Sequence, residues 1–162
     1  MTFARAFARI LWLVYVLCLS QSTGAAARQD PAVSVQQIQA ALERGDVDGA
    51  KTAVEAGLRA YPDDPALQNF AGVISAQRGD WTAAETHFRE AIRLAPRAVP
   101  PYENLGRLYQ LRSVADPTAR AKALDVYRAL LSVDPANAEG LFQAALLRAQ
   151  AGEFAASRAL LE

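Results

Sequence analysis

Groups that perform chemistry are scarce in this chain of 162 residues. It has a single cysteine, Cys18, and a single histidine, His87. One thiol cannot form a disulfide within the chain, and one histidine falls short of the usual zinc ligand sets. The sequence contains no glycine-rich phosphate loop and no recognisable Ser-His-Asp arrangement. It therefore predicts a protein that is not an enzyme and that uses no metal or other cofactor.

An excess of charge and long alternating runs are also missing. The 17 basic and 17 acidic residues give a formal net charge of zero. Without a basic stripe there is no reason to expect nucleic acid as a partner. The adjacent acids Asp63 and Asp64 precede an expected helix, where capping explains them. Because no long segment alternates between apolar and polar residues, we expect no sheet, and the fold class predicted is all-α.

A short apolar run lies near the N-terminus. Arg5 and Arg9 precede the apolar residues 10–19, and small residues follow as far as Ala27. This order is typical of a secretory signal peptide over residues 1–27, and the run is shorter than the roughly 20 residues of a membrane-spanning helix. We expect cleavage near Ala27 and export to the periplasm or medium. The alternative is a retained segment that anchors the protein in the membrane. Cys18 lies inside the run, which disfavours lipidation.

The rest of the chain repeats a pattern of Gly-Asp, then alanine, then proline. Copies of this pattern lie 34 residues apart. The interval from Ala84 to Ala123 is 39 residues, so we place an insertion in the turn at residues 113–117. Self-similarity at this period is typical of stacked helix–turn–helix units. The copies 34 residues apart are Gly45-Asp46, Ala50 and Pro62, and Gly79-Asp80, Ala84 and Pro96.

The repeating unit resembles the tetratricopeptide repeat. The segment from residue 65 supplies the family's residues at Gly72, Gly79-Asp80, Trp81, Ala84, Phe88, Ala91 and Pro96. The segment from residue 99 supplies Tyr102, Leu105-Gly106, Tyr109, Ala123, Tyr127 and Pro135. Few lysines and abundant alanine add an association with GC-rich bacterial genomes. The resemblance implies an α-solenoid of about 3.5–4 stacked antiparallel helix pairs. Together with the signal-peptide pattern and the composition, it leads us to expect an exported bacterial TPR-containing protein.

The solenoid is expected to form one domain over residues 28–162. Its units would lie at about 31–64, 65–98, 99–137 with the insertion, and 138–162, the last incomplete. The expected helix pairs are roughly 32–44 with 47–60, 66–78 with 81–94, 101–112 with 117–133, and 138–151 with 153–162.

Residue types within the repeats agree with this arrangement. Small residues such as Gly72 and Gly106 would let two helices approach closely, while Phe88 and Tyr127 fill the space beside them. We interpret Asp64, Asp80 and Asp116 as N-caps. His87 is read as an ordinary helix-surface residue, since a general base needs a cleft and a partner. Trp81 and Phe154 follow the turns and are expected to pack across them; the alternative is an exposed aromatic contact.

In this family the first helix of each pair lines a concave groove. A face that mixes amides with apolar side chains suits an extended peptide. An equally open reading is that these residues are solvated or contact the next helix. Position by position, the resemblance implies that the groove residues are Val35, Gln39, Leu42, Asn69, Val73, Gln77, Glu103, Arg107, Gln110, Phe142, Leu146 and Gln150.

Some members of the family hold an acidic C-terminus with a clamp of Lys, Asn and Arg. Here the groove offers only Arg107, with Asn104 beside it and Glu103 opposing it. The clamp is not reproduced, so we do not expect binding of a chaperone tail.

Three functional hypotheses follow. The first is a non-enzymatic protein–protein interaction scaffold of the bacterial envelope, which binds a partner peptide or protein in its groove and touches the membrane only through an uncleaved signal segment. The alternative is the N-terminal recognition region of a longer envelope enzyme or assembly factor. The third is self-association through the apolar C-terminal end, which predicts dimers that disappear when Leu160 and Leu161 become polar.

Overall fold

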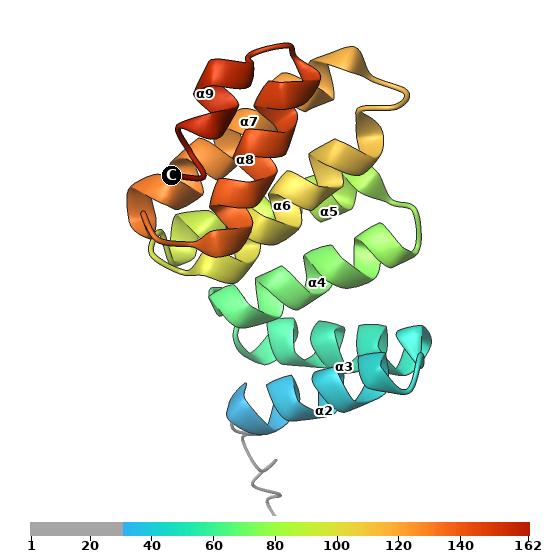
Figure 1. The fold of residues 1–162 in the computed structure, drawn as a ribbon. Helices are drawn as coiled ribbons and strands as arrows, with labels where there is room; N and C mark the ends of the chain where they lie inside the picture. The colour runs from blue at the N-terminus through green and yellow to red at the C-terminus, as the bar shows by residue number, and fades with distance from the viewer. Residues whose placement is uncertain (1–30) are drawn as a thin grey trace, which may run out of the picture. The chain divides into compact units, whose positions relative to one another are not determined.

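The computed structural model describes residues 31–162, with side chains from Val35 onward. All regular structure in this range is helical (Figure 1), as the sequence predicts. None of these helices has the length and apolar character to cross a bilayer. The predicted signal peptide and Cys18 lie outside the described residues. The helices are α2 (Pro31–Glu43), α3 (Val47–Ala60), α4 (Pro65–Gln77), α5 (Trp81–Leu94), α6 (Val99–Arg112), α7 (Pro117–Val133), α8 (Ala138–Gln150) and α9 (Phe154–Arg158).

Consecutive helices form antiparallel pairs that stack in chain order, α2 with α3, α4 with α5, α6 with α7 and α8 with α9 (Figure 1). Helix α4 contacts both α2 and α6, so the first helices of successive pairs lie side by side. We call the surface made by α2, α4, α6 and α8 the first-helix face. The predicted α-solenoid is confirmed.

Two predicted boundaries differ from the structure by more than one residue. Helix α6 begins at Val99 rather than near 101, because Pro100 and Pro101 occupy its first turn, where a missing N–H costs no hydrogen bond. Helix α9 ends at Arg158 rather than at 162. Glu153 provides no side-chain cap, and no residue of α9 is buried, so little holds a longer helix in place.

The turns explain why the Gly-Asp pair recurs. Gly45 and Gly79 have φ of 72° and 79°, a left-handed conformation that residues with a side chain rarely adopt. The aspartate that follows each glycine caps the next helix. Asp46 accepts a hydrogen bond from the Gly49 amide, and Asp80 accepts one from the Ala83 amide at 3.0 Å.

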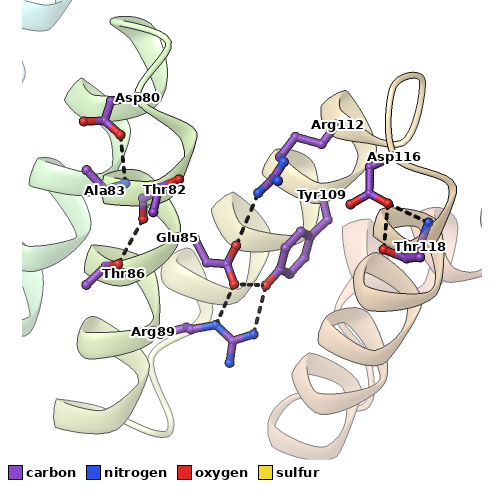
Figure 2. A network of polar contacts seen from close by, with 10 residues as sticks. All are labelled: Asp80, Thr82, Ala83, Glu85, Thr86, Arg89, Tyr109, Arg112, Asp116 and Thr118. Atoms are coloured by element: carbon purple, nitrogen blue, oxygen red, sulfur yellow. Dashed lines mark hydrogen bonds and ion pairs between the residues drawn. The ribbon is translucent and has the colours of Figure 1, made fainter.

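The remaining predicted caps are also confirmed. Asp64 accepts hydrogen bonds from the first turn of α4, including the Ala66 amide at 2.8 Å. Asp116 accepts from the backbone N–H of Thr118 at 2.9 Å, as Figure 2 shows. Each of these aspartates precedes a proline at the first helical position, which has no N–H to satisfy.

The inserted residues lengthen a helix pair rather than forming a loose loop. Helix α7 has 17 residues where α5 has 14, and α6 has 14 where α4 has 13. The connection between α6 and α7, residues 113–116, has no glycine; instead the Ser113 hydroxyl donates to the Gln110 carbonyl at 2.6 Å. Val114 at its tip is 94% exposed. The extra residues therefore lie mostly in the helices that flank the predicted turn, mainly in α7.

Small and large residues meet between the two helices of a pair. A Cβ added to Gly72 would lie 2.5 Å from the ring of Phe88, and one added to Gly106 would lie 2.5 Å from the ring of Tyr127. Both rings are almost fully buried. The close approach that the sequence predicts is thus present in two successive repeats.

The core divides into two clusters along the stack. The first cluster draws on α2, α3 and α4, and the second on α5, α6, α7 and α8. The first contains Ile38, Ala41, Ala50, Val54, Leu67, Ala71 and Ile74. The second contains Ala84, Phe88, Tyr102, Leu105, Leu108, Tyr109, Ala119, Ala123, Tyr127, Leu130, Ala144 and Leu147.

Candidate functional site

The predicted groove residues lie on the first helices α2, α4, α6 and α8, and they differ in exposure. None of them is fully buried. The exposed ones are Gln39, Gln77, Arg107, Phe142, Leu146 and Gln150, and the half-buried ones are Asn69, Val73, Glu103 and Gln110. Val35 and Leu42 are half-buried and pack against the first core cluster.

Three of these residues, Val35, Gln39 and Asn69, line a pocket of about 390 Å³ that spans α2, α4 and the start of α6. We call it the proline pocket. Its lining contains no charged side chain, so it offers an apolar cavity edged by two amides. Its other lining residues are Pro65, Ala66, Phe70, Ala98, Pro100 and Pro101.

The sequence interpretation missed Phe70, Pro100 and Pro101. The sequence analysis assigns no role to the two prolines, and Phe70 follows the predicted groove position 69. Their role depends on α6 starting at Val99, which brings the two prolines beside α4. The adjacent prolines were the available signal, because their rings favour the first turn of a helix at a repeat boundary.

A second pocket, of about 160 Å³, lies between α4 and α6 and contains Val73, Gln77 and Arg107. We call it the arginine pocket. Leu111, 66% exposed, forms part of its edge. The predicted residues Phe142, Leu146 and Gln150 line neither pocket; they lie farther along the stack, on α8.

Side-chain hydrogen bonds connect the first helices. The Asn104 amide donates to Asn69 Oδ1 at 3.0 Å, which joins α6 to α4. Farther along, Gln110 donates to Gln143 Oε1 at 2.7 Å, which joins α6 to α8. The side-chain oxygen of Asn69 accepts the bond from Asn104, and its amide nitrogen is left available as a donor. Gln39 makes no side-chain hydrogen bond within the described range, so both amides at the proline pocket retain free donors.

The charge of Arg107 is already paired. Its guanidinium lies 3.0 Å from Glu139 Oε1, and this hydrogen bond lowers the pKa of Glu139 below its ordinary value. Asn104 is bound to Asn69 and Glu103 lies close to Asn137, at 3.5 Å. A neutralised arginine flanked by two carboxylates makes a poor receptor for an acidic peptide.

His87 lies on the second helix α5 and is half-buried rather than on an open surface. Its Nδ1 is 2.8 Å from Gln68 Oε1, so the neutral ring donates to the amide oxygen of the neighbouring helix. Burial lowers the pKa of His87, with partial opposition from the negative charge of Asp80. Within the described residues no cluster of three or more His, Cys, Asp or Glu side chains is arranged to hold a metal ion.

Lowering the pH from about 7 to about 5 is expected to destabilise the fold through His87. A folded-state pKa below the ordinary value of about 6.5 means that the unfolded chain binds the proton more readily. The stability contributed by neutral His87 is complete above about pH 6.5 and is lost as the pH falls below it. Urea unfolding across this range measures the loss.

The variant His87→Gln is the matched control, because its amide retains a donor for Gln68 and does not titrate. Its unfolding free energy should change less between about pH 6.5 and about pH 5 than that of the parent protein. Carboxylates with lowered pKa, such as Glu85, act only below about pH 4.5. Equal pH dependence in the two proteins would contradict this role of His87.

Apolar side chains remain exposed on α8 and beyond it. Phe142 is 54% exposed and Phe154 is 71% exposed, so the prediction that Phe154 packs across its turn is wrong. Leu160 packs against the second core cluster, whereas Leu161 is exposed. A polar residue at position 160 would therefore disturb the core as well as the surface.

Comparison with known proteins agrees with this geometry. Residues 35–99 match the family model of the tetratricopeptide repeat. Beyond residue 99 the helix pairs continue, and Gly106 packs on Tyr127 as Gly72 packs on Phe88. Residues 35–99 thus carry tetratricopeptide repeats, a kind of repeat whose stacked helices form extended binding surfaces. No curated protein sequence matches it significantly.

Solved structures share the fold at low sequence identity. A thermophilic TPR protein of Thermus thermophilus is 22% identical with a TM-score of 0.68, over 82% of this chain and 71% of that one. The first TPR domain of Spaghetti (RPAP3), bound to the HSP90 peptide SRMEEVD, is 18% identical with a TM-score of 0.66, over 76% and 97%. An O-GlcNAc transferase of Thermobaculum terrenum is 19% identical with a TM-score of 0.65, over 79% of this chain and 23% of that one.

Proposed function

We propose that this protein is a non-enzymatic interaction scaffold of the bacterial envelope, and that its first-helix face binds an extended segment of a partner protein. The observation that carries the proposal is the proline pocket, an uncharged cavity with free amide donors on Gln39 and Asn69. Such a site takes an apolar side chain while the amides bind the backbone carbonyls beside it.

The charges of this face favour a neutral segment over an acidic one. Arg107 is paired with Glu139, and Glu103 adds a further negative charge nearby. The TPR domain of Spaghetti is solved with the acidic peptide SRMEEVD. Here, an acidic tail would meet carboxylates without a free cation, so the expected ligand of this face differs in charge.

Photo-crosslinking in cells that produce the full chain tests the proposal. A benzophenone amino acid at Gln39 or Gln77 should crosslink to the same partner, because these exposed residues line the two pockets. The same probe at Arg59, exposed on α3, should not. Asn69→Ala should reduce the crosslink yield by about five- to tenfold, as expected for the loss of one or two hydrogen bonds.

The purified adduct also reports on export. If the protein is exported and cleaved near Ala27, mass spectrometry of material from the envelope fraction should find Arg28 at the N-terminus. Equal crosslinking from all three positions would contradict a groove, and so would an unchanged yield in a folded Asn69→Ala variant. An uncut chain in the cytosol would contradict export but leave the groove result intact.

A second candidate function is that these repeats are the recognition region of a longer enzyme or assembly factor. The similarity to the O-GlcNAc transferase, of which this chain covers 23%, favours it, because a repeat segment of this size occurs there within a much larger protein. A partner crosslinked at Gln39 that proves to be a substrate of an activity on the same polypeptide would support this alternative.

A further inference from the structure

A pocket of about 410 Å³ lies away from the first-helix face, between the second helices α5 and α7. We call it the rear pocket. None of the predicted groove residues lines it. Its apolar surface comes from Ile92, Leu105, Val126 and Ala129, and the side chains of Tyr102 and Tyr109 complete the cavity. A cavity of this size accommodates one or two side chains of a ligand.

Positive charge predominates at this pocket. Arg89 and Arg93 reach it from α5, and Lys122 reaches it from α7, whereas Asp125 is the only acidic residue of the lining. Asp125 is engaged by Arg128 of the same helix at 3.2 Å. The carboxylate of the lining is therefore paired, as are Arg89 with Glu85 and Arg93 with Glu90, so Lys122 is the cation that an incoming anion would meet first.

Lys122 is the least engaged of these cations. Its Nζ lies 5.8 Å from the centre of the Tyr109 ring. It is within electrostatic range of Glu85 and Asp116, but among the residues described it forms an ion pair with neither. Arg93, in contrast, is held by Glu90 at 2.6 Å. Lys122 thus offers a charge that needs no existing ion pair to break.

Arg89 is held in place by a network that Figure 2 shows. Its Nη2 donates to the Tyr109 hydroxyl at 2.9 Å, and that hydroxyl donates to Glu85 Oε1 at 2.7 Å. Arg89 Nε donates to the same carboxylate, and Arg112 approaches its other oxygen at 3.4 Å. Arg89 Nη1 makes no hydrogen bond to any residue that the structure describes, which leaves a fixed donor at the pocket.

The protonation states of this network are stable near neutral pH. Burial is the largest influence on Glu85 and opposes its ionisation, but the hydrogen bonds and charges of Tyr109 and Arg89 outweigh it and lower the pKa. Burial, together with the hydrogen bond to Glu85, raises the pKa of the Tyr109 hydroxyl. Glu85 therefore remains a carboxylate and Tyr109 a neutral donor, so the cationic group of Arg89 stays oriented.

We propose that the rear pocket is a second protein-binding site, which takes an acidic side chain and a neighbouring aliphatic side chain of a partner segment. The carboxylate binds Lys122 Nζ and Arg89 Nη1, and the aliphatic group rests on Ile92 and Val126. Charge complementarity selects an acidic segment here, whereas the first-helix face suits a neutral one. The proposal does not depend on the groove, since the two sites share no lining residue.

The two lysines of the chain, Lys51 and Lys122, allow a direct test. Reductive methylation with ¹³C-formaldehyde labels both amines and keeps their charge. The probe is a capped peptide of alternating glutamate and leucine, titrated while NMR follows the methyl signals. The Lys122 signal should shift and saturate, while Lys51, which is paired with Glu55 on α3, should not move.

Matched peptides and variants separate the contributions. Lys122→Gln removes the reporting amine, so its Kd is measured by calorimetry and should rise by about fivefold. Replacing the glutamates of the peptide by glutamine should raise the Kd at least as much. Lys51→Gln should leave the Kd unchanged. Exchange of leucine for serine in the probe should also weaken binding, and so should a rise in salt from about 50 to about 500 mM.

Three results would overturn the proposal. The first is a parallel or non-saturating shift of both lysine signals, and the second is an unchanged Kd in the Lys122→Gln variant. The third is tight binding of 4-methylpentanoate, a small molecule that has one carboxylate and the aliphatic group of a leucine side chain. If it binds as tightly as the peptide, the pocket is a site for small organic acids and not for a protein segment.

Discussion

Replacing Tyr127 with alanine is expected to lower the free energy of unfolding by about 3–5 kcal/mol. The ring is fully buried in the second core cluster, and its removal leaves a cavity between α6 and α7. The Tyr127 hydroxyl also donates to Gln110 Oε1 at 3.1 Å. Because a domain of this size is stable by only about 5–15 kcal/mol, the loss would be a large share of the total. Urea unfolding followed by circular dichroism measures it.

Tyr127→Phe is the control for that experiment. It keeps the ring and removes only the hydroxyl, so the expected loss is about 1 kcal/mol. A Tyr127→Ala variant no less stable than Tyr127→Phe would show that the ring does not support the core. An intermediate value would instead measure how far α6 and α7 close around the cavity.

The second large effect concerns the small residues opposite the rings. Gly72→Ala and Gly106→Ala are each expected to lower the free energy of unfolding by about 1–3 kcal/mol. Alanine is intrinsically the better helix former, by about 1 kcal/mol. However, its Cβ would lie 2.5 Å from an aromatic ring that is buried and unable to move aside. Overpacking should therefore outweigh propensity, and thermal unfolding of the two variants tests which effect is larger.

Gly140→Ala provides the comparison within the same protein. Its Cβ would meet the flexible end of Leu130 at 3.1 Å rather than a ring, so this variant should be close to neutral or slightly stabilised. A double variant, Gly106→Ala with Tyr127→Leu, should lose less than the sum of its parts, because leucine yields to the new methyl group. Stabilisation by alanine at position 72 or 106 would refute the close-packing account.

The features that sequence reasoning predicted well are local or repeat within one helix pair. A glycine followed by aspartate specifies a left-handed turn and a cap within five residues, and both are present at Gly79 and Asp80. The pairing of Gly106 with Tyr127 follows from the register of two adjacent helices. These relations need no knowledge of the rest of the molecule, because the repeat fixes which residues oppose each other.

The features that sequence reasoning missed depend on how successive helix pairs pack against each other. The proline pocket requires α2, α4 and the start of α6 together, so no single repeat contains it. The rear pocket similarly joins α5 to α7. The exposure of Phe154 depends on how far α9 extends, and a short helix with no buried residue gives the aromatic ring nothing to cover it. Position in a repeat therefore indicates a face, but not the depth at which a side chain lies on it.

The hydrogen bonds between first helices have a mechanical consequence. They join α4 to α6 through Asn69 and Asn104 and α6 to α8 through Gln110 and Gln143, but none is described between the side chains of α2 and α4 from residue 35 onward. The first core cluster contains α2, α3 and α4, while Val73 and Ala76 of α4 also pack against the second cluster. When the stack is pulled along its axis, the interface between α2 and α4, which lacks such bonds among the described side chains, would stretch more easily than the interfaces of α6 with α4 and α8. The stiffness of the solenoid would then decrease toward α2, where the proline pocket lies.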